Sequence, residues 1–231
     1  MNRNTGMLAP KSPTRSDKRN RIPRRMCLLI AAAVIMCSSA SFAATREAAP
    51  PQIIAYVFPQ NSVVQPGEIA ARKLTRINYA FANIQNGLMV NGFPTDAANF
   101  TALNALKQQN PSLKILVSVG GWLWSGNFSD AVLTPQSRKA FIDSAVAFIE
   151  RYNLDGLDID WEYPGLAGAT NHFRPEDKQN YTAVLKELRA RFNQEQKKLH
   201  RHLYLSVATG SDIDFLEHTE MAKVEIGRAH V

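Results

Sequence analysis

The sequence contains very little cysteine, with only Cys27 and Cys37 in 231 residues. Both lie within the first 43 residues, which have the pattern of a leader. Once that leader is removed, the remaining chain can form no disulfide and has no thiol nucleophile and no cysteine metal site. Its fold must therefore be held together by packing alone.

The body of the chain also lacks an excess of either charge. The whole sequence has a formal charge of +7, but residues 1–43 contain eight of its 27 basic residues and only one of its 20 acidic residues. This leaves 19 residues of each sign in the rest of the chain. The basic excess belongs to the leader, so it gives no support to a nucleic-acid-binding function.

Residues 1–43 have the order of a secretory signal peptide. A basic segment ends at Arg24 and Arg25, an apolar run follows from Met26 to Cys37, and small residues lead to a predicted cleavage site after Ala43. The apolar run is too short for a comfortable membrane span, although an uncleaved anchor is the alternative. We predict a secreted protein, extracellular or periplasmic, that does not contact the membrane after cleavage, with residues 44–52 as a linker.

From residue 53 onward, strand-like and helix-like segments alternate, with no internal repeat and no dinucleotide-binding glycine fingerprint. Helices are predicted at 96–109, from Pro135 and from Pro175. The apolar strand-like segments are 53–58, 76–84, 113–121, the acid-rich segment within 154–165, and 203–210. Strands that are apolar on both faces and separated by helices indicate a parallel sheet, either open and doubly wound or closed into a barrel.

The acid-rich segment, LDGLDIDWEYPG, favours the barrel. Side chains two apart on a strand face the same way, so Asp158, Asp160 and Glu162 would form a ladder with steps of about 6.6 Å. On a helix-covered face of an open sheet they would be buried at heavy cost. Inside a barrel they would form a row that leads to the C-terminal mouth, where barrel enzymes have their active sites. Asp155 has the opposite parity and is expected to fix the start of the strand.

The ladder predicts acid–base chemistry. Three close carboxylates cannot all ionise cheaply, so at least one pKa should be raised. Glu162, nearest the mouth, is the expected proton donor, and Asp160 would face developing positive charge, as in cleavage of a glycosidic bond. A calcium or magnesium site is the alternative, but calcium usually takes such carboxylates from a flexible loop rather than a stiff strand. We predict no metal and no cofactor.

The segment DGLDIDWE resembles the D-x-x-D-x-D-x-E signature of family 18 glycoside hydrolases, the chitinases. SVGG, which contains Ser118, Gly120 and Gly121, is similar to the S-x-G-G of their third strand, and YAFANI and WEYPG are also similar to bacterial members. The resemblance runs from about residue 53 to 224. It implies a TIM (β/α)8 barrel and retaining hydrolysis of β-1,4-linked N-acetylglucosamine in chitin or chitooligosaccharides, by a monomer when full length.

The resemblance also implies a substrate-assisted mechanism. Glu162 would protonate the leaving oxygen and later activate water, while the sugar's own acetamido oxygen attacks the anomeric carbon. Asp160, backed by Asp158, would orient that acetamide. The aromatic residues that match the family's sugar platforms are Tyr56, Phe81, Trp122 and Tyr163, and for the first two, core packing is an equal alternative.

Only about five of the eight βα units of such a barrel are recognisable. We therefore expect residues 53–224 to be the N-terminal part of the catalytic domain and residues 225–231, EIGRAHV, to be a non-native tail, so that this fragment itself is expected to be inactive. The alternative functions are a chitin-binding lectin that has lost catalysis, which usually lacks the terminal acid, and an endo-β-N-acetylglucosaminidase acting on glycans or cell wall.

Overall fold

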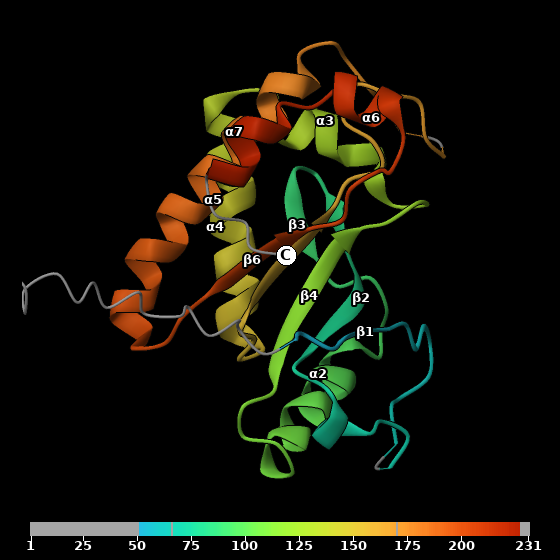
Figure 1. Cartoon of the computed structure of the whole chain (residues 1–231), viewed down its shortest axis with the longest axis vertical. Coiled ribbons are helices and arrows are strands. Elements are labelled where there is room, and N and C mark those ends of the chain that lie inside the picture. The colour runs from blue at the N-terminus through green and yellow to red at the C-terminus, as the bar shows by residue number, and fades with distance from the viewer. Residues whose placement is uncertain (1–50, 66, 170, 227–231) are drawn as a thin grey trace, which may run out of the picture. The chain divides into compact units, whose positions relative to one another are not determined.

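A computed structural model of the protein describes residues 51–65, 67–169 and 171–226 (Figure 1). The predicted signal peptide, all but the last two residues of the linker, and residues 227–231 of the predicted tail lie outside the described residues. No helix in the described part of the chain is both long and apolar enough to cross a membrane.

Five parallel strands form the sheet, and they lie side by side in the order in which the chain visits them (Figure 1). They are β1 (Ile54–Val57), β2 (Arg76–Gln85), β4 (Lys114–Gly120), β5 (Gly156–Asp160) and β6 (Tyr204–Val207). A doubly wound sheet reverses its strand order at a switch point, whereas a (β/α) barrel does not. The described elements are therefore those of a partial TIM barrel, with five of its eight strands.

A short strand pairs antiparallel with the end of β2. The turn residues Asn86 and Gly87, both with positive φ, connect β2 to β3 (Leu88–Val90), and Met89 pairs with Ile84. The sequence predicted the turn but not β3, which has only three residues.

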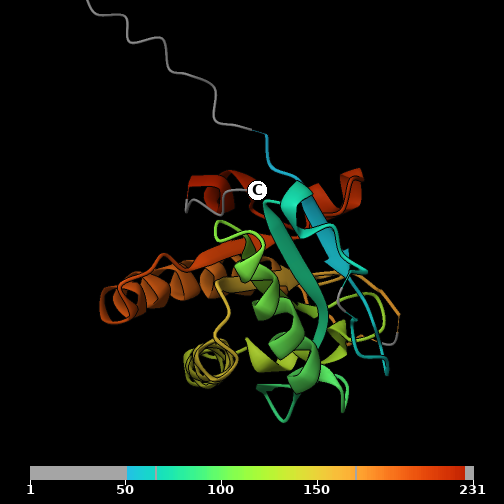
Figure 2. The same cartoon turned by 90° about the horizontal axis from the view of Figure 1, so that it is seen from below.

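Three long helices cover one side of the sheet (Figures 1 and 2). They are α2 (Asp96–Ala105), α4 (Pro135–Arg151) and α5 (Asp177–Leu199). The predicted helix at 96–109 is split between α2 and a 3-10 turn, η2 (Leu106–Gln108), while α5 begins two residues after Pro175. The shorter elements are η1 (Ala71–Lys73), η3 (Ser125–Asn127), α3 (Phe128–Ala131), α6 (Ile213–Glu217) and α7 (Met221–Ile226).

The start of α4 shows how local sequence sets a boundary. Thr134 adopts an extended conformation, and its hydroxyl accepts a hydrogen bond from the amide of Ser137. The Ser137 hydroxyl in turn accepts from the amide of Thr134, and Pro135 occupies the first helical position. This reciprocal cap satisfies amides that have no partner within the helix. The predicted start at Pro135 is confirmed.

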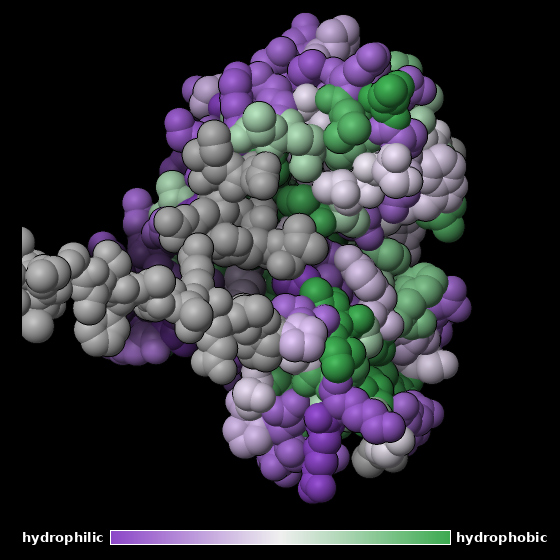
Figure 3. All heavy atoms as spheres, in the orientation of Figure 1, coloured by the Kyte–Doolittle hydropathy of each residue, from purple (hydrophilic) through white to green (hydrophobic). Residues whose placement is uncertain are grey.

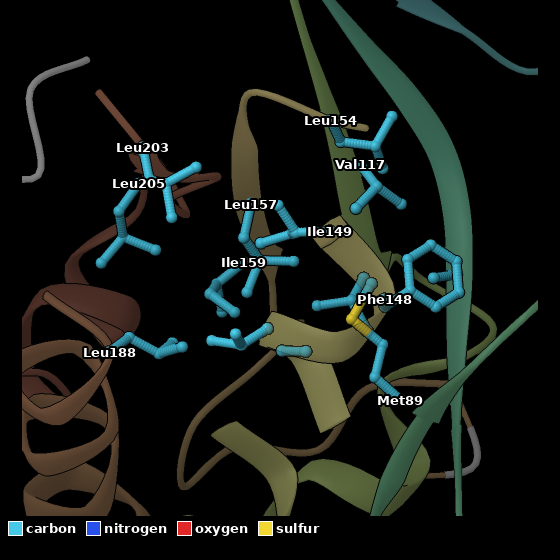
Figure 4. Close-up of a cluster of buried hydrophobic side chains, with 14 of the residues drawn as sticks. Met89, Val117, Phe148, Ile149, Leu154, Leu157, Ile159, Leu188, Leu203 and Leu205 are labelled. Atoms are coloured by element: carbon cyan, nitrogen blue, oxygen red, sulfur yellow. The ribbon is translucent and has the colours of Figure 1, made fainter. Parts of the chain in front are cut away.

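The two faces of the sheet differ sharply in composition. Alternate strand residues such as Val117, Leu157, Ile159 and Leu205 point toward the helices and join one hydrophobic core with residues such as Leu188 (Figure 4). Most of their neighbours on the opposite face are polar or small, with Leu116 as an apolar exception: Asn78, Ser118, Gly120, Gly156, Asp158, Asp160 and Ser206. The outer face therefore carries the packing that stabilises the fold, and the inner face is left for chemistry.

Candidate active site

The acid ladder lies at the carboxyl end of β5. Asp158 and Asp160 lie on the inner face of the strand, opposite the core residues Leu157 and Ile159. The strand ends at Asp160, and Glu162 follows two residues later in the connection to α5. Side-chain parity thus separates Asp158 and Asp160 from the apolar residues beside them, as the sequence predicted. The sequence also placed Glu162 on the strand, and this was wrong, because β5 ends two residues before it.

Asp158 is almost fully buried, with 1% of its surface exposed, and it accepts hydrogen bonds from four other strands. Its Oδ2 accepts from the Tyr56 hydroxyl at 2.7 Å, the Asn78 amide at 2.9 Å and the Ser118 hydroxyl at 2.8 Å. Its Oδ1 accepts from the Ser206 hydroxyl at 2.6 Å. These donors satisfy both oxygens of the buried carboxyl and fix its position on the inner face.

Asp160 has very different surroundings. It is 5% exposed, and its Oδ1 has no hydrogen-bond partner among the described residues. Burial, followed by the charges of Glu162 and Asp158 and a hydrogen bond with the Glu162 carboxyl, raises the pKa of Asp160 to about 8. The raised pKa favours the protonated form of Asp160, the middle acid of the ladder, at neutral pH.

Glu162 and Tyr163 lie half-buried at the mouth of the inner face. The main-chain amide of Glu162 donates to the Ser125 hydroxyl at 2.9 Å. The ring of Tyr163 lies edge-on to Trp122, with 6.3 Å between centroids, and burial together with the adjacent Glu162 raises the pKa of the Tyr163 hydroxyl. Trp122 is half exposed, so the two rings border the acid site without closing it.

The Gly120–Gly121 turn connects the acids to an aromatic pocket. Both glycines have positive φ, and a Cβ on Gly120 would overlap the carbonyl oxygen of Asp160. A Cβ on Gly121 would meet the ring of Phe81. The pocket beside this turn has a volume of about 460 Å³ and is lined mainly by rings. Its lining includes Phe58, Phe81, Phe93, Trp122 and Trp124.

Asp155 lies at the opposite end of β5 from the other acids. Its carboxylate contacts Lys107 at 2.7 Å and Arg201 at 3.5 Å and accepts the amide of Ile115 at 2.8 Å. These contacts attach the start of β5 to β4 and to the residues just before β6.

Three site residues were missed from the sequence: Asn78, Ser125 and Ser206. Asn78 and Ser206 each interrupt an apolar strand at an inward-facing position, and that parity was the available signal. No comparable signal marks Ser125. No group of three or more His, Cys, Asp and Glu side chains within the described ranges could hold a metal ion.

Comparison with known proteins places this geometry in a family. The family described as "Glycosyl hydrolases family 18" matches residues 52–225. The chain is 35% identical to Chitinase A1 of Niallia circulans over 244 residues, which is 83% of this chain and 35% of that protein. The chain therefore spans about a third of the length of this relative.

Solved structures show the same likeness. Chitinase ChiA74 from Bacillus thuringiensis superposes with a TM-score of 0.72 at 30% identity, covering 77% of this chain and 38% of that chain. A family 18 N-acetylglucosaminidase from Paenibacillus barengoltzii gives a TM-score of 0.68 at 37% identity, covering 77% and 51%. The protein belongs to glycoside hydrolase family 18.

Proposed function

We propose that the protein hydrolyses β-1,4-linked N-acetylglucosamine polymers, chitin and its oligosaccharides, with retention of configuration. The observation that carries the proposal is the row of acids at the end of β5: Asp158 held by four donors, a buried Asp160 with a raised pKa, and a half-buried Glu162. A carboxyl with a raised pKa beside a second carboxyl at the mouth of a barrel is suited to proton transfer near neutral pH.

Each acid has a distinct role in this reaction. Glu162 donates a proton to the glycosidic oxygen as the bond to the anomeric carbon breaks. The 2-acetamido oxygen of the same sugar attacks that carbon and forms an oxazolinium intermediate, so no enzyme nucleophile is needed. Asp160, supported by Asp158, holds the acetamide. Glu162, now a carboxylate, removes a proton from the water molecule that attacks the anomeric carbon and opens the oxazolinium ring.

The aromatic residues supply the sugar contacts. Trp122, which is half exposed, and the half-buried Tyr163 border the acid site, where sugar rings can stack on them. Tyr56 contributes through its hydrogen bond to Asp158, and Phe81 lines the adjoining pocket. Ser118 serves the site by holding Asp158, and Gly120 lets β4 approach β5 closely. Gly121 leaves room for the ring of Phe81.

Activity is expected of the complete protein, by which we mean this chain extended by the remaining strands of the barrel. The support is that the chain matches about a third of Chitinase A1 and contains five barrel strands. We further propose that the complete protein is a monomer and is secreted through the leader at residues 1–43, with 44–52 as its linker and 225–231 as a non-native tail.

The decisive experiment replaces the proton donor. In the complete protein, Glu162→Gln should reduce hydrolysis of a fluorogenic chitobioside at least 1,000-fold, since general acid–base catalysis contributes about 10²–10⁴ and both steps use this group. The affinity for a chitooligosaccharide should stay within about threefold. Glu150→Gln, on the exposed side of α4, is the matched control and should keep wild-type turnover.

Two outcomes would contradict the proposal. Wild-type protein that binds chitooligosaccharide without turnover would be a chitin-binding lectin. A Glu162→Gln variant with more than a tenth of wild-type turnover would remove Glu162 from the mechanism. Product analysis on chitin and on high-mannose glycans separates chitin hydrolysis from endo-β-N-acetylglucosaminidase action.

A further inference from the structure

The main chain at Glu162 lies beyond the last hydrogen bonds between β5 and its neighbouring strands. The last bonds that tie β5 to its neighbours are made by the carbonyl oxygens of Ile159, which accepts from Ala208 at 3.0 Å, and Asp160, which accepts from Gly121 at 2.7 Å. Glu162 follows the end of the strand, so ladder pairing does not fix it. In the described part of the chain its amide has one hydrogen-bond partner, the Ser125 hydroxyl.

The Ser125 side chain is fully buried, and its oxygen lies where three main-chain groups converge. Besides the amide of Glu162, Oγ lies 3.0 Å from the carbonyl oxygen of Gly121 and 3.0 Å from that of Asp160. A hydroxyl can donate once and accept at the same time. Ser125 therefore donates to one of these two carbonyls and accepts a hydrogen bond from the Glu162 amide.

The two carbonyls have other donors and the Glu162 amide does not. The Asp160 oxygen also accepts from Gly121, and the Gly121 oxygen also accepts from the amides of Trp124 and Ser125. Of these three groups, only the amide of Glu162 would thus be left without a hydrogen-bond partner among the described residues if the Ser125 hydroxyl were lost.

A second contact from the same segment holds the preceding residue. The Trp161 ring stacks on Phe128, with centroids 5.1 Å apart and planes 13° apart, and both rings are buried. The segment from Ser125 to Phe128 therefore contacts residue 161 through its side chain and residue 162 through its main chain. Stacking fixes the position of Trp161, and the hydroxyl fixes the direction in which the chain leaves it.

We propose that Ser125 is a positioning residue for Glu162: its hydroxyl holds the main chain so that the carboxyl stays within reach of Asp160 and of the scissile bond. This inference rests on the proposed function for its effect on turnover, although the contact itself does not. A group held by Ser125 acts on the orientation of the acid and not on sugar stacking, so it should affect the chemical step and leave binding alone.

The test compares two serine variants of the complete protein. Ser125→Ala should lower kcat on a fluorogenic chitobioside about 10- to 100-fold with KM changed less than threefold, the scale expected when a reacting group is slightly misplaced. Ser144→Ala is the matched control, because that hydroxyl also accepts a strand amide, from Met89 at 2.8 Å, and donates to a carbonyl, of Phe141 at 2.7 Å. It should keep wild-type kcat.

A second substitution and a second measurement keep the inference falsifiable. Ser125→Cys keeps the buried volume but offers only a weak sulfur acceptor, so its kcat should lie between those of wild type and Ser125→Ala. Hydrogen–deuterium exchange at the Glu162 amide should rise at least tenfold in Ser125→Ala and not in Ser144→Ala.

Each outcome has a defined meaning. Unchanged exchange at Glu162, kcat within twofold of wild type, or equal losses in both alanine variants would overturn the role of Ser125. If wild type has no turnover on any glycan, the proposed function fails, while the exchange measurement still decides whether Ser125 holds the Glu162 amide.

Discussion

At the scale of residues, the three acids of the ladder differ more in their surroundings than in their spacing. Asp158 is met by four donors, whereas Asp160, one step along the same strand, has a buried oxygen without a partner in the described residues. Two carboxyls that lie two residues apart on one strand thus have contrasting surroundings, and such contrasts are how like groups acquire different roles on one scaffold.

Asp160 should therefore destabilise the folded protein as pH rises. Its pKa is about 8 when folded and ordinary when unfolded, so the native state binds the extra proton between about pH 4 and pH 8 and stability falls across that window. Asp160→Asn removes the penalty and should raise Tm of the complete protein at pH 8 by about 2–4 °C, the shift that about 1 kcal/mol produces in a domain of this size.

Thermal unfolding measured from pH 4 to pH 8 checks this expectation. The gain in Tm should be absent at pH 4, where the carboxyl is protonated in both states, and should grow as pH rises. Asp214→Asn, in the exposed part of α6, is a suitable control and should give no pH-dependent gain. A wild-type protein whose stability increased steadily up to pH 8, matched by Asp160→Asn, would contradict the raised pKa.

Parity made the ladder predictable, but it could not identify the partners of Asp158. The four donors lie 102, 80, 40 and 48 residues away in sequence. Which inward-facing residues meet depends on the register between strands, for example Ser118 opposite Asp158 and Asp158 opposite Ser206. Register is set by packing across the whole sheet, so a single sequence shows which side chains face inward and not which of them touch.

At the scale of elements, the site depends on how closely β4 ends against β5. Gly120 has φ of +107°, and a Cβ there would overlap the Asp160 carbonyl oxygen. Gly120→Ala therefore combines an unfavourable φ with a steric clash against main chain and should destabilise the complete protein by about 2–5 kcal/mol. The clash would also move Asp160, so turnover should fall with stability.

Gly87→Ala separates the two causes. Gly87 has φ of +76° in the turn between β2 and β3, and a Cβ there would have nothing within 4 Å. Gly87→Ala should lower the free energy of unfolding by only about 1–2 kcal/mol, the penalty for the left-handed conformation. It should leave turnover unchanged. Urea unfolding of both variants gives the comparison; equal losses at the two positions would show that close approach at Gly120 contributes nothing.

Elements with local signals were predicted well, and those without them were not. The cap at Thr134 and the proline that follows it fix the start of α4 within the sequence itself. The η3 turn that carries Ser125 has no side-chain cap bond and depends on contacts with Gly121 and β5, which lie outside its own segment. The residue that holds Glu162 was therefore beyond sequence reasoning.

At the scale of the whole molecule, the partial barrel leaves surfaces that a closed barrel covers. β1 and β6 are the outer strands of the sheet, and each pairs on only one side among the described residues. Apolar side chains are also exposed beside β1, at Ile53 and Phe58, and on α6, at Ile213 and Leu216. Figure 3 shows that hydrophobic surface is exposed on this view of the molecule. Unpaired edges with apolar flanks are templates for association with other chains.

The 231-residue chain alone should therefore associate and lack turnover, while the complete protein should be a monomer that hydrolyses chitobioside. Size-exclusion chromatography with light scattering and the fluorogenic assay measure both properties. A double variant of the 231-residue chain, Ile213→Lys with Leu216→Lys, removes the α6 surface and should still associate, because the strand edges remain. A monomeric 231-residue chain with robust turnover would show that five strands suffice, and recovery of a monomer by the double variant would assign the association to α6.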